Sequence, residues 1–434
     1  MTVGSSKKIG VCIIVVKNKN FNTGWLYAPY DYEDGYSVDL SEQTFEPVCV
    51  PHANKILKSY KGDDFQAQIE SYRFVSWYRR HFVLDGSYAN KKVWVEFEGV
   101  ATVAKVYVNG EYVGEHKGAY TGFTFDITDY IKADGSDNVI AVRVDSTKQK
   151  EVPPEIGNVD YCLFGGIVRN VNMIVTEKIY VDDITITTPC IDSGDSAVHI
   201  KTIVKNDTNE AEDIEVEAII KDASGNAVTT GLKKMSLKNN GKSECEFDTG
   251  EVKDVKLWCV DEPNLYTAEI RIRNGNKYTD VTSERFGFRW FEFTNTDDES
   301  AFYINGEKMK LSGINRHEQW PWIGRAANDK LQASDADLIK ETGLNAVRCS
   351  HYPQSKSFLE RCDEIGLIVF EEAPGWQDIG NDTWKEVYIE NVKEMISRDK
   401  NHPSIISWGV RVNESYDDHD LYEKTNSIAR EMDS

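Results

Sequence analysis

The chain has 434 residues, of which 40% are hydrophobic and 11% aromatic, and its 50 basic and 72 acidic residues give a formal net charge of −22. This length predicts two to four domains with packed cores. The acidic balance argues against nucleic acid and anionic membranes as partners, because both require a basic surface. No apolar run reaches membrane-spanning length.

The cysteines and the first apolar run bear on cellular location. None of the eight cysteines forms a Cys-x-x-Cys pair, which argues against a zinc site. Several lie inside apolar strands, as buried free thiols do, so we expect a reducing, cytoplasmic compartment, although an even count leaves disulfides open. The apolar run from Ile9 to Val16 is short and lacks a cleavage site, so it predicts a first strand rather than a signal peptide.

Residues 1–177 are predicted to form a domain of many short strands. Lys92 to Gly99 and Asn138 to Val144 alternate between apolar and polar residues, as half-buried strands do. Ala104 to Gly110 ends in Asn-Gly, a strong hairpin signal. This spacing of strands and turns predicts an all-β sandwich of the jelly-roll type.

Residues 178–291 continue the all-β pattern with fewer aromatic residues. Val198 to Val204, Ile214 to Ile220 and Thr267 to Ile272 are examples of the expected strands. About seven strands in a segment of this length predict an immunoglobulin-like sandwich. We interpret Trp258 and Pro263 as structural residues near its last strands.

From residue 292 to 434, strands alternate with helices, which predicts a parallel sheet with crossover helices. The expected strands are Lys310–Asn315, Asn345–Cys349, Leu367–Phe370 and Ile405–Val412. The expected helices are Asp329–Thr342 and Ser357–Ile365, each closed by a glycine, and Thr383 to about Arg398, capped by Asp382. A (β/α)₈ TIM barrel needs about 250 residues. We therefore expect only about its first half here, which favours a truncated protein.

The last expected strand ends on an amide and a carboxylate, Asn413 and Glu414. Catalytic groups of a (β/α)₈ barrel lie at the carboxyl ends of its strands. We therefore interpret Glu414 as a catalytic acid/base and Asn413 as a residue that positions substrate beside it.

Several motifs occur together in a recognisable order. They are Ser76-Trp77-Tyr78-Arg79-Arg80, Gly165-Gly166-Ile167-Val168-Arg169, Gly313-Ile314-Asn315-Arg316-His317-Glu318, Asn345 to Pro353, and Arg398 to Glu414. In this order and spacing they resemble glycoside hydrolase family two, the group of β-galactosidases and β-glucuronidases. The resemblance covers essentially the whole chain, and it implies the domain order jelly roll, immunoglobulin-like sandwich and catalytic barrel.

The resemblance implies a retaining exo-β-glycosidase that hydrolyses terminal non-reducing β-glycosides by double displacement. Glu414 matches the family's acid/base, whereas its nucleophile belongs to a later barrel strand, so we assign none and expect the chain as given to be inactive alone. The residues of the Asn315–Glu318 and Arg348–Pro353 motifs resemble those of the family's galactosidases more than its glucuronidases, which favours β-D-galactosides. A β-glucuronidase, another family-two glycosidase and a non-catalytic carbohydrate-binding fragment stay open as alternatives.

The resemblance also implies further sugar-binding residues, each of which has a plainer structural alternative. The candidates are Arg348, His317, His351, Asp160, Trp376 and Trp408. Arg348 would steady the nucleophile and the histidines would line the sugar pocket, or these residues would be structural. Asp160 would reach the sugar from the jelly roll, or it would belong to a turn. The two tryptophans would stack on the sugar or would lie in the barrel core.

One departure from the family concerns metal. Some galactosidases of the family hold magnesium with a Glu and a His after the third barrel strand. Here Trp376 and Asp378 occupy those places, so we expect no metal and no cofactor. The expected partner is a carbohydrate substrate, and a homo-oligomer stays open.

Overall fold

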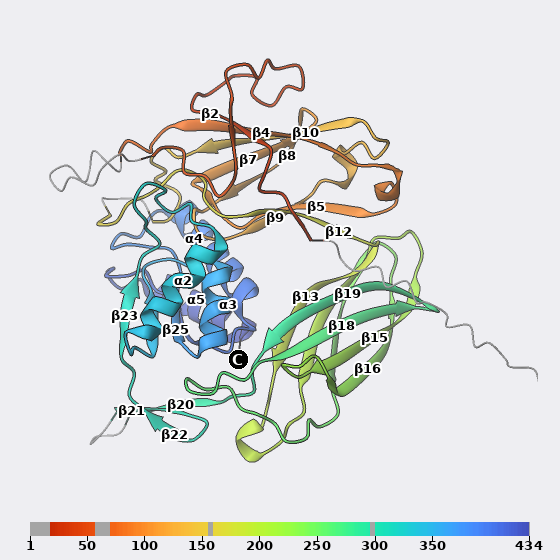
Figure 1. Ribbon diagram of the computed structural model, residues 1–434, viewed down its shortest axis with the longest axis vertical. Coiled ribbons are helices and arrows are strands. Elements are labelled where there is room, and N and C mark those ends of the chain that lie inside the picture. The colour runs from red at the N-terminus through yellow and green to blue at the C-terminus, as the bar shows by residue number, and fades with distance from the viewer. Residues whose placement is uncertain (1–17, 57–69, 155–158, 296–299, 434) are drawn as a thin grey trace, which may run out of the picture.

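The computed structural model describes residues 18–56, 70–154, 159–295 and 300–433. The strand expected from Ile9 to Val16 therefore lies outside the described residues. Two β-sandwiches are followed by a parallel sheet covered by helices (Figure 1). None of the helices in the described ranges is long and apolar enough to cross a membrane.

The first domain is a jelly-roll sandwich, as predicted. One sheet has the order β1 (Lys19–Asn20), β12 (Val171–Thr176), β5 (Lys92–Phe97) and β9 (Phe123–Asp126). The other has the order β3 (Glu46–Val48), β2 (Trp25–Ala28), β4 (Val75–Val83), β10 (Asp137–Asp145), β7 (Val103–Val108) and β8 (Glu111–Lys117). Between them lie the short pair β11 (Gly166–Ile167) and β6 (Val100–Ala101), and 3-10 turns at Gly86–Tyr88 and Thr128–Tyr130.

The jelly-roll core follows from strand alternation. Along β5 every second side chain is buried, so Val93, Val95 and Phe97 point inward. They pack against residues of the facing sheet, such as Trp25 and Tyr78. This arrangement buries a large aromatic and aliphatic core between the two sheets.

The second domain is an immunoglobulin-like sandwich, also as predicted. Its three-stranded sheet contains β13 (Ile179–Thr187), β14 (His199–Asn206) and β17 (Gly241–Asp248). Its four-stranded sheet has the order β16 (Ala227–Leu237), β15 (Glu212–Lys221), β18 (Tyr266–Asn274) and β19 (Lys277–Phe286), and a 3-10 turn lies at Ile191–Ser193. Trp258 is fully buried, and its Nε1 donates to the carbonyl of Asp363, which fastens this domain to the barrel portion.

The third domain is part of a TIM barrel. A hairpin sheet of β20 (Phe291–Asn295), β21 (Ser300–Ile304) and β22 (Glu307–Met309) precedes it. The parallel strands β23 (Gly313–Arg316), β24 (Ala346–Cys349), β25 (Ile368–Glu372) and β26 (Ile405–Gly409) are neighbours in chain order. The helices are α2 (Asp329–Glu341), α3 (Lys356–Ile365), α4 (Asp382–Asp399) and α5 (His419–Met432).

The two faces of the parallel sheet meet different partners. Val347 and Val369 pack outward against Phe358 and Leu359 of α3. The alternate residues, such as Ile368 of β25, pack on the opposite face with Trp258 and the hairpin. Residues at the carboxyl ends of the strands that point to this second face therefore enter the barrel interior.

Some element boundaries differ from the predictions. Strand β25 continues to Glu372, so Glu371 and Glu372 belong to the strand and not to a loop. Strand β26 ends at Gly409 rather than Val412, because the chain beyond leaves the ladder and pairs again only where Asn413 bridges Trp376. The cap of α4 is Asn381 rather than Asp382, since its side chain accepts from the amide of Trp384.

Candidate active site

Four parallel strands bring polar residues to one edge of the sheet. We call them the site cluster: His317 after β23, Arg348 and His351 at and after β24, Glu372 at the end of β25, and Asn413 and Glu414 after β26. The carboxyl ends of parallel strands share one edge, so residues distant in sequence meet there. Among the predicted site residues, the structure brings these five candidates together with Glu372.

Arg348 is the centre of the site cluster. Its guanidinium forms a two-point ion pair with Glu372, with Nε 2.7 Å from Oε2 and Nη2 3.0 Å from Oε1. Nη2 also donates to Asn413 Oδ1 at 2.8 Å. His351 Nδ1 lies 3.2 Å from Glu372 Oε1 and 3.4 Å from Arg348 Nη2. A planar guanidinium that holds a carboxylate and an amide in this way fixes both side chains in one orientation.

The two polar groups of the Asn413 side chain differ in their hydrogen bonding. Its Oδ1 accepts from Arg348, whereas its Nδ2 is buried and has no acceptor among the described residues. An unpaired buried donor costs free energy and is a common sign of a functional role. This N–H is therefore available to a bound hydroxyl group.

Glu414 follows at a sharp turn in the chain. Its φ of 57° lies in the left-handed region, which costs a non-glycine residue on the order of 1–3 kcal/mol. The side chain is exposed, and its Oε2 accepts from Gln377 Nε2 at 3.1 Å. The backbone N–H of Gln377 also donates to the backbone carbonyl of Asn413 at 2.8 Å. The loop after β25 therefore supports the turn that presents the Glu414 carboxylate.

The jelly roll contributes a residue to the site that we did not predict. Tyr161 is buried, and its ring lies 5.2 Å from that of His317 and 6.1 Å from those of His351 and Trp376. Its neighbour Asp160 is exposed. Tyr161 follows a predicted site residue directly, which was the only signal that could have identified it.

Burial controls the charge of His317. It lowers the pKa of His317 to about 4, and the nearby His351 and Arg348 act in the same direction, whereas Asp160 and Glu372 oppose them. His317 is therefore a neutral imidazole at neutral pH. The effect of Asp160 on His317 places it within electrostatic range of the site, and that Asp160 reaches a sugar stays a prediction.

The two candidate tryptophans have different environments. Trp376 joins the site, where it is 7% exposed and its ring lies 4.9 Å from that of His351, and its stacking against a sugar stays a prediction. Trp408 does not join the site. It packs against the helix layer, and its Nε1 donates to Asp433 beside the end of α5. A register shift between β25 and β26 accompanies this outward orientation.

The donor set does not match the magnesium site of the family's galactosidases. Trp376 offers no ligand, Asp378 is exposed, and Glu372 is occupied by Arg348 and His351. Within the described ranges, no group of three or more His, Cys, Asp or Glu residues could hold a metal ion. That the protein binds no metal stays a prediction.

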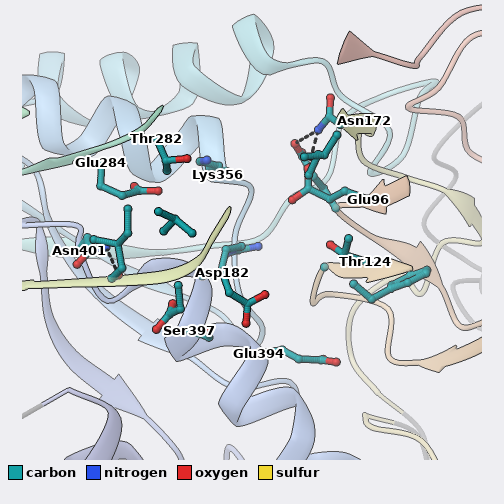
Figure 2. Close-up of a pocket in the computed structure, with 18 of the residues that line it drawn as sticks. Glu96, Thr124, Asn172, Asp182, Thr282, Glu284, Lys356, Glu394, Ser397 and Asn401 are labelled. Carbon is teal, nitrogen blue, oxygen red and sulfur yellow. Dashed lines mark hydrogen bonds between the residues drawn. The ribbon is translucent and has the colours of Figure 1, made fainter. Parts of the chain in front are cut away.

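A separate hollow of about 790 Å³ lies between the two sandwiches and the outside of helices α3 and α4. Figure 2 shows Glu96 and Thr124 from the jelly roll, Glu284 from the immunoglobulin-like domain, and Lys356 and Glu394 from the barrel helices. None of the site-cluster residues lines it. This hollow is therefore distinct from the candidate active site.

The family descriptions that match the chain agree with its three-domain fold. Residues 60–177 match "Glycosyl hydrolases family 2, sugar binding domain", residues 179–289 "Glycosyl hydrolases family 2", and residues 296–434 "Glycosyl hydrolases family 2, TIM barrel domain". The chain belongs to glycoside hydrolase family two. The barrel residues of the site cluster all lie in the segment that matches the family's TIM barrel domain.

Individual family-two relatives are similar over nearly the whole chain. A β-galactosidase of Thermoanaerobacter pseudethanolicus is 46% identical over 95% of this chain and 54% of its own length, and one of Thermoanaerobacterium thermosulfurigenes is 40% identical over 95% and 56%. The solved β-glucuronidase of Bacteroides uniformis is 28% identical, with a TM-score of 0.86 over 96% of this chain and 51% of its own. The chain spans about half the length of these relatives.

Proposed function

We propose that this chain carries the acid/base part of a retaining exo-β-glycosidase that acts on terminal β-D-galactosides. The observation that carries the proposal is the pair Asn413 and Glu414 at the end of the fourth parallel strand, with Asn413 fixed by Arg348. In this proposal Glu414 is the general acid and base, and Asn413, Arg348, His351 and His317 surround the sugar.

In the first step, a carboxylate nucleophile attacks the anomeric carbon while the bond to the leaving oxygen breaks, and Glu414 gives its proton to that oxygen. In the second step, water attacks the glycosyl-enzyme, and Glu414 accepts the proton from the water. We assign no residue of this chain as the nucleophile. The proposal therefore concerns a polypeptide in which the barrel is complete.

The charges near the described part of the site support a neutral sugar over a uronic acid. Arg348 is already paired with Glu372 at two points. His317 is neutral because burial lowers its pKa to about 4. Asp160 and Glu414 add carboxylates, so a glucuronide carboxylate would meet no unpaired arginine or lysine within the site cluster. The relatives named as β-galactosidases at 46% and 40% identity support the same choice.

The test is the release of nitrophenol from matched nitrophenyl β-galactoside, β-glucuronide and β-glucoside by the enzyme with a complete barrel. We expect the β-galactoside to have the highest kcat/KM. A preference for the glucuronide would overturn the sugar assignment but keep the glycosidase. No release from any of them, together with measurable sugar binding, would favour the non-catalytic carbohydrate-binding alternative.

A further inference from the structure

A buried charge cluster joins the jelly roll to the barrel beside the site. Arg169, just before β12 of the jelly roll, is 2% exposed, and Glu318, two residues beyond β23 of the barrel, is fully buried. Arg169 Nη2 lies 3.1 Å from each oxygen of the Glu318 carboxylate. Arg325 Nε donates to the same carboxylate at 2.9 Å. We call this set of three residues the dry junction.

The dry junction holds the segment that carries His351. Arg169 Nη2 also donates to the carbonyl of Pro353 at 2.6 Å, and the amide of Ser355 donates to Glu318 Oε1 at 2.6 Å. Both contacts fall on residues 350–355, the connection between β24 and α3. His351 is two residues before Pro353, so the fastening lies directly beside a site residue.

Aromatic contacts extend these links to the segments that carry His317 and His351. Arg169 Nη1 donates to the carbonyl of Tyr120, whose ring stacks on Tyr352 at 4.1 Å. The Tyr352 hydroxyl accepts from the amide of Glu318 at 3.0 Å and lies 3.4 Å from His317 Nδ1. One jelly-roll guanidinium is thus linked, through short contacts, to the segments that bear both histidines.

The charges of the dry junction are strongly interdependent. Burial alone would raise the pKa of Glu318, but Arg169, Arg325 and Arg316 outweigh it and lower that pKa to about 2. Removing one partner from such a cluster leaves buried charge uncompensated. The charges of the cluster are therefore energetically coupled.

We propose that Arg169 of the sugar-binding domain is a positioning residue for the glycosidase site, which it serves by clamping residues 350–355 and thereby orienting His351. This proposal rests on the proposed function of the site. A misplacement of about 1 Å at a reacting centre can cost roughly 10²-fold in rate. The jelly roll would then contribute to turnover through geometry as well as through any direct contact with sugar.

The clamp needs arginine rather than a positive charge alone. One nitrogen of the guanidinium fork contacts Tyr120, and the other contacts Glu318 and Pro353. A lysine ammonium is a single point and cannot reproduce this fork. Arg169→Lys therefore keeps the charge and removes the clamp. The matched control is Arg79→Lys. Arg79 is a fully buried arginine of the same domain, and it binds Glu42 and the carbonyl of Gly35.

The first part of the test measures the exchange of backbone amide hydrogens in the 1–434 chain, and it needs no enzymatic activity. In Arg169→Lys we expect faster exchange of the amides in residues 350–355 and unchanged exchange in the strands of all three domains. Arg79→Lys should leave residues 350–355 unchanged. If Arg169→Lys does not fold, Tyr120→Leu removes the stack on Tyr352 and the ring beside Arg325 but keeps the ion pairs with Glu318, and it should expose the same segment. Unchanged protection of residues 350–355 in both variants would overturn the clamp.

The second part of the test is a double-mutant cycle in the enzyme with a complete barrel, measured with a dinitrophenyl galactoside. Arg169→Lys should lower kcat/KM by roughly 10–100-fold, mostly through kcat. In a His351→Asn background, the same change should cost less than about twofold, because the residue through which it acts is absent. Additive losses would overturn the positioning role. A wild-type enzyme with no glycosidase activity would overturn the proposed function instead, and the exchange measurement would still decide the clamp.

Discussion

Ser355 and Lys356 are neighbours in the chain, yet they lie in opposite kinds of contact between the sugar-binding domain and the barrel. Ser355 is buried in the dry junction, where its amide donates to Glu318. Lys356 is exposed to the hollow between the domains (Figure 2), which Glu284, Glu96 and Glu98 also line, and it forms no direct ion pair among the described residues. The domains thus meet through buried, directly paired charges beside the site and across an open hollow behind the helices.

The two contacts differ in how their charged groups are paired and how far apart those groups lie. In the dry junction, the charges of Arg169, Arg325 and Glu318 are buried and directly paired. In the hollow, burial raises the pKa of both Glu98 and Glu284, and their charges act on Lys356 across open space. Charges separated by water interact weakly and are screened by salt. We therefore expect mutations to be costly in the first contact and mild in the second.

The largest expected effect is that of Glu318→Gln. It leaves two buried arginines without their carboxylate, and breaking a buried ion pair in this way costs about 3–5 kcal/mol. Urea unfolding of the 1–434 chain measures the loss. The control is Glu394→Gln at the wall of the hollow, where the side chain is partly exposed, its contact with His116 can be kept by the amide oxygen, and a clearly smaller loss is expected. Equal losses of unfolding free energy in the two variants would contradict the difference between the two contacts.

An intermediate effect is expected on acid stability. The pKa of Glu318 is lowered from 4.5 to about 2 in the folded protein. A carboxyl group with a depressed folded pKa stabilises the fold above its unfolded pKa, and this contribution is lost as pH falls through the folded value. Stability should therefore decline between about pH 4.5 and 2. Glu318→Gln should flatten that part of the pH profile, and an unchanged decline would show that other carboxyl groups cause it.

The smallest effect is expected for Lys356→Met. Lys356 makes no direct ion pair among the described residues and faces an open hollow, so the change should stay within about 1 kcal/mol. Melting curves at low and high salt measure it, and salt should reduce the difference further. A loss as large as that of Glu318→Gln would mean that the hollow is a structural contact of the same kind as the dry junction.

Much of the architecture could be predicted from local sequence. Strand alternation identified both sandwiches, and the change to alternating strands and helices identified the barrel. The end of β26 then located Asn413 and Glu414, because the carboxyl end of a barrel strand is a known position for catalytic groups. These conclusions depend on periodicity and on chain order, which a single sequence contains. Arg348 and His351 were instead expected at the site from the family resemblance.

The rest depends on contacts between segments far apart in sequence. Glu372 was taken for a loop residue because the apolar run stops at Phe370, although the strand continues beyond it. Trp408 was a candidate for the pocket, but a register shift accompanies its outward orientation. The roles of Tyr161 and Arg169 depend on how the jelly roll docks on the barrel. No pattern within either domain specifies that docking.

The central claim is that Glu414 is the acid/base, and the most direct measurement is the leaving-group dependence of Glu414→Gln in the enzyme with a complete barrel. The variant should lose roughly 10²–10⁴-fold on an alkyl β-galactoside, which needs a proton on its leaving oxygen. A dinitrophenyl galactoside needs little protonation, so its first step should be spared, and azide should restore turnover by attacking the glycosyl-enzyme without a base. Glu423→Gln, an exposed glutamate on α5, is the control and should behave as wild type. Equal losses on both substrates with no rescue by azide would contradict the assignment.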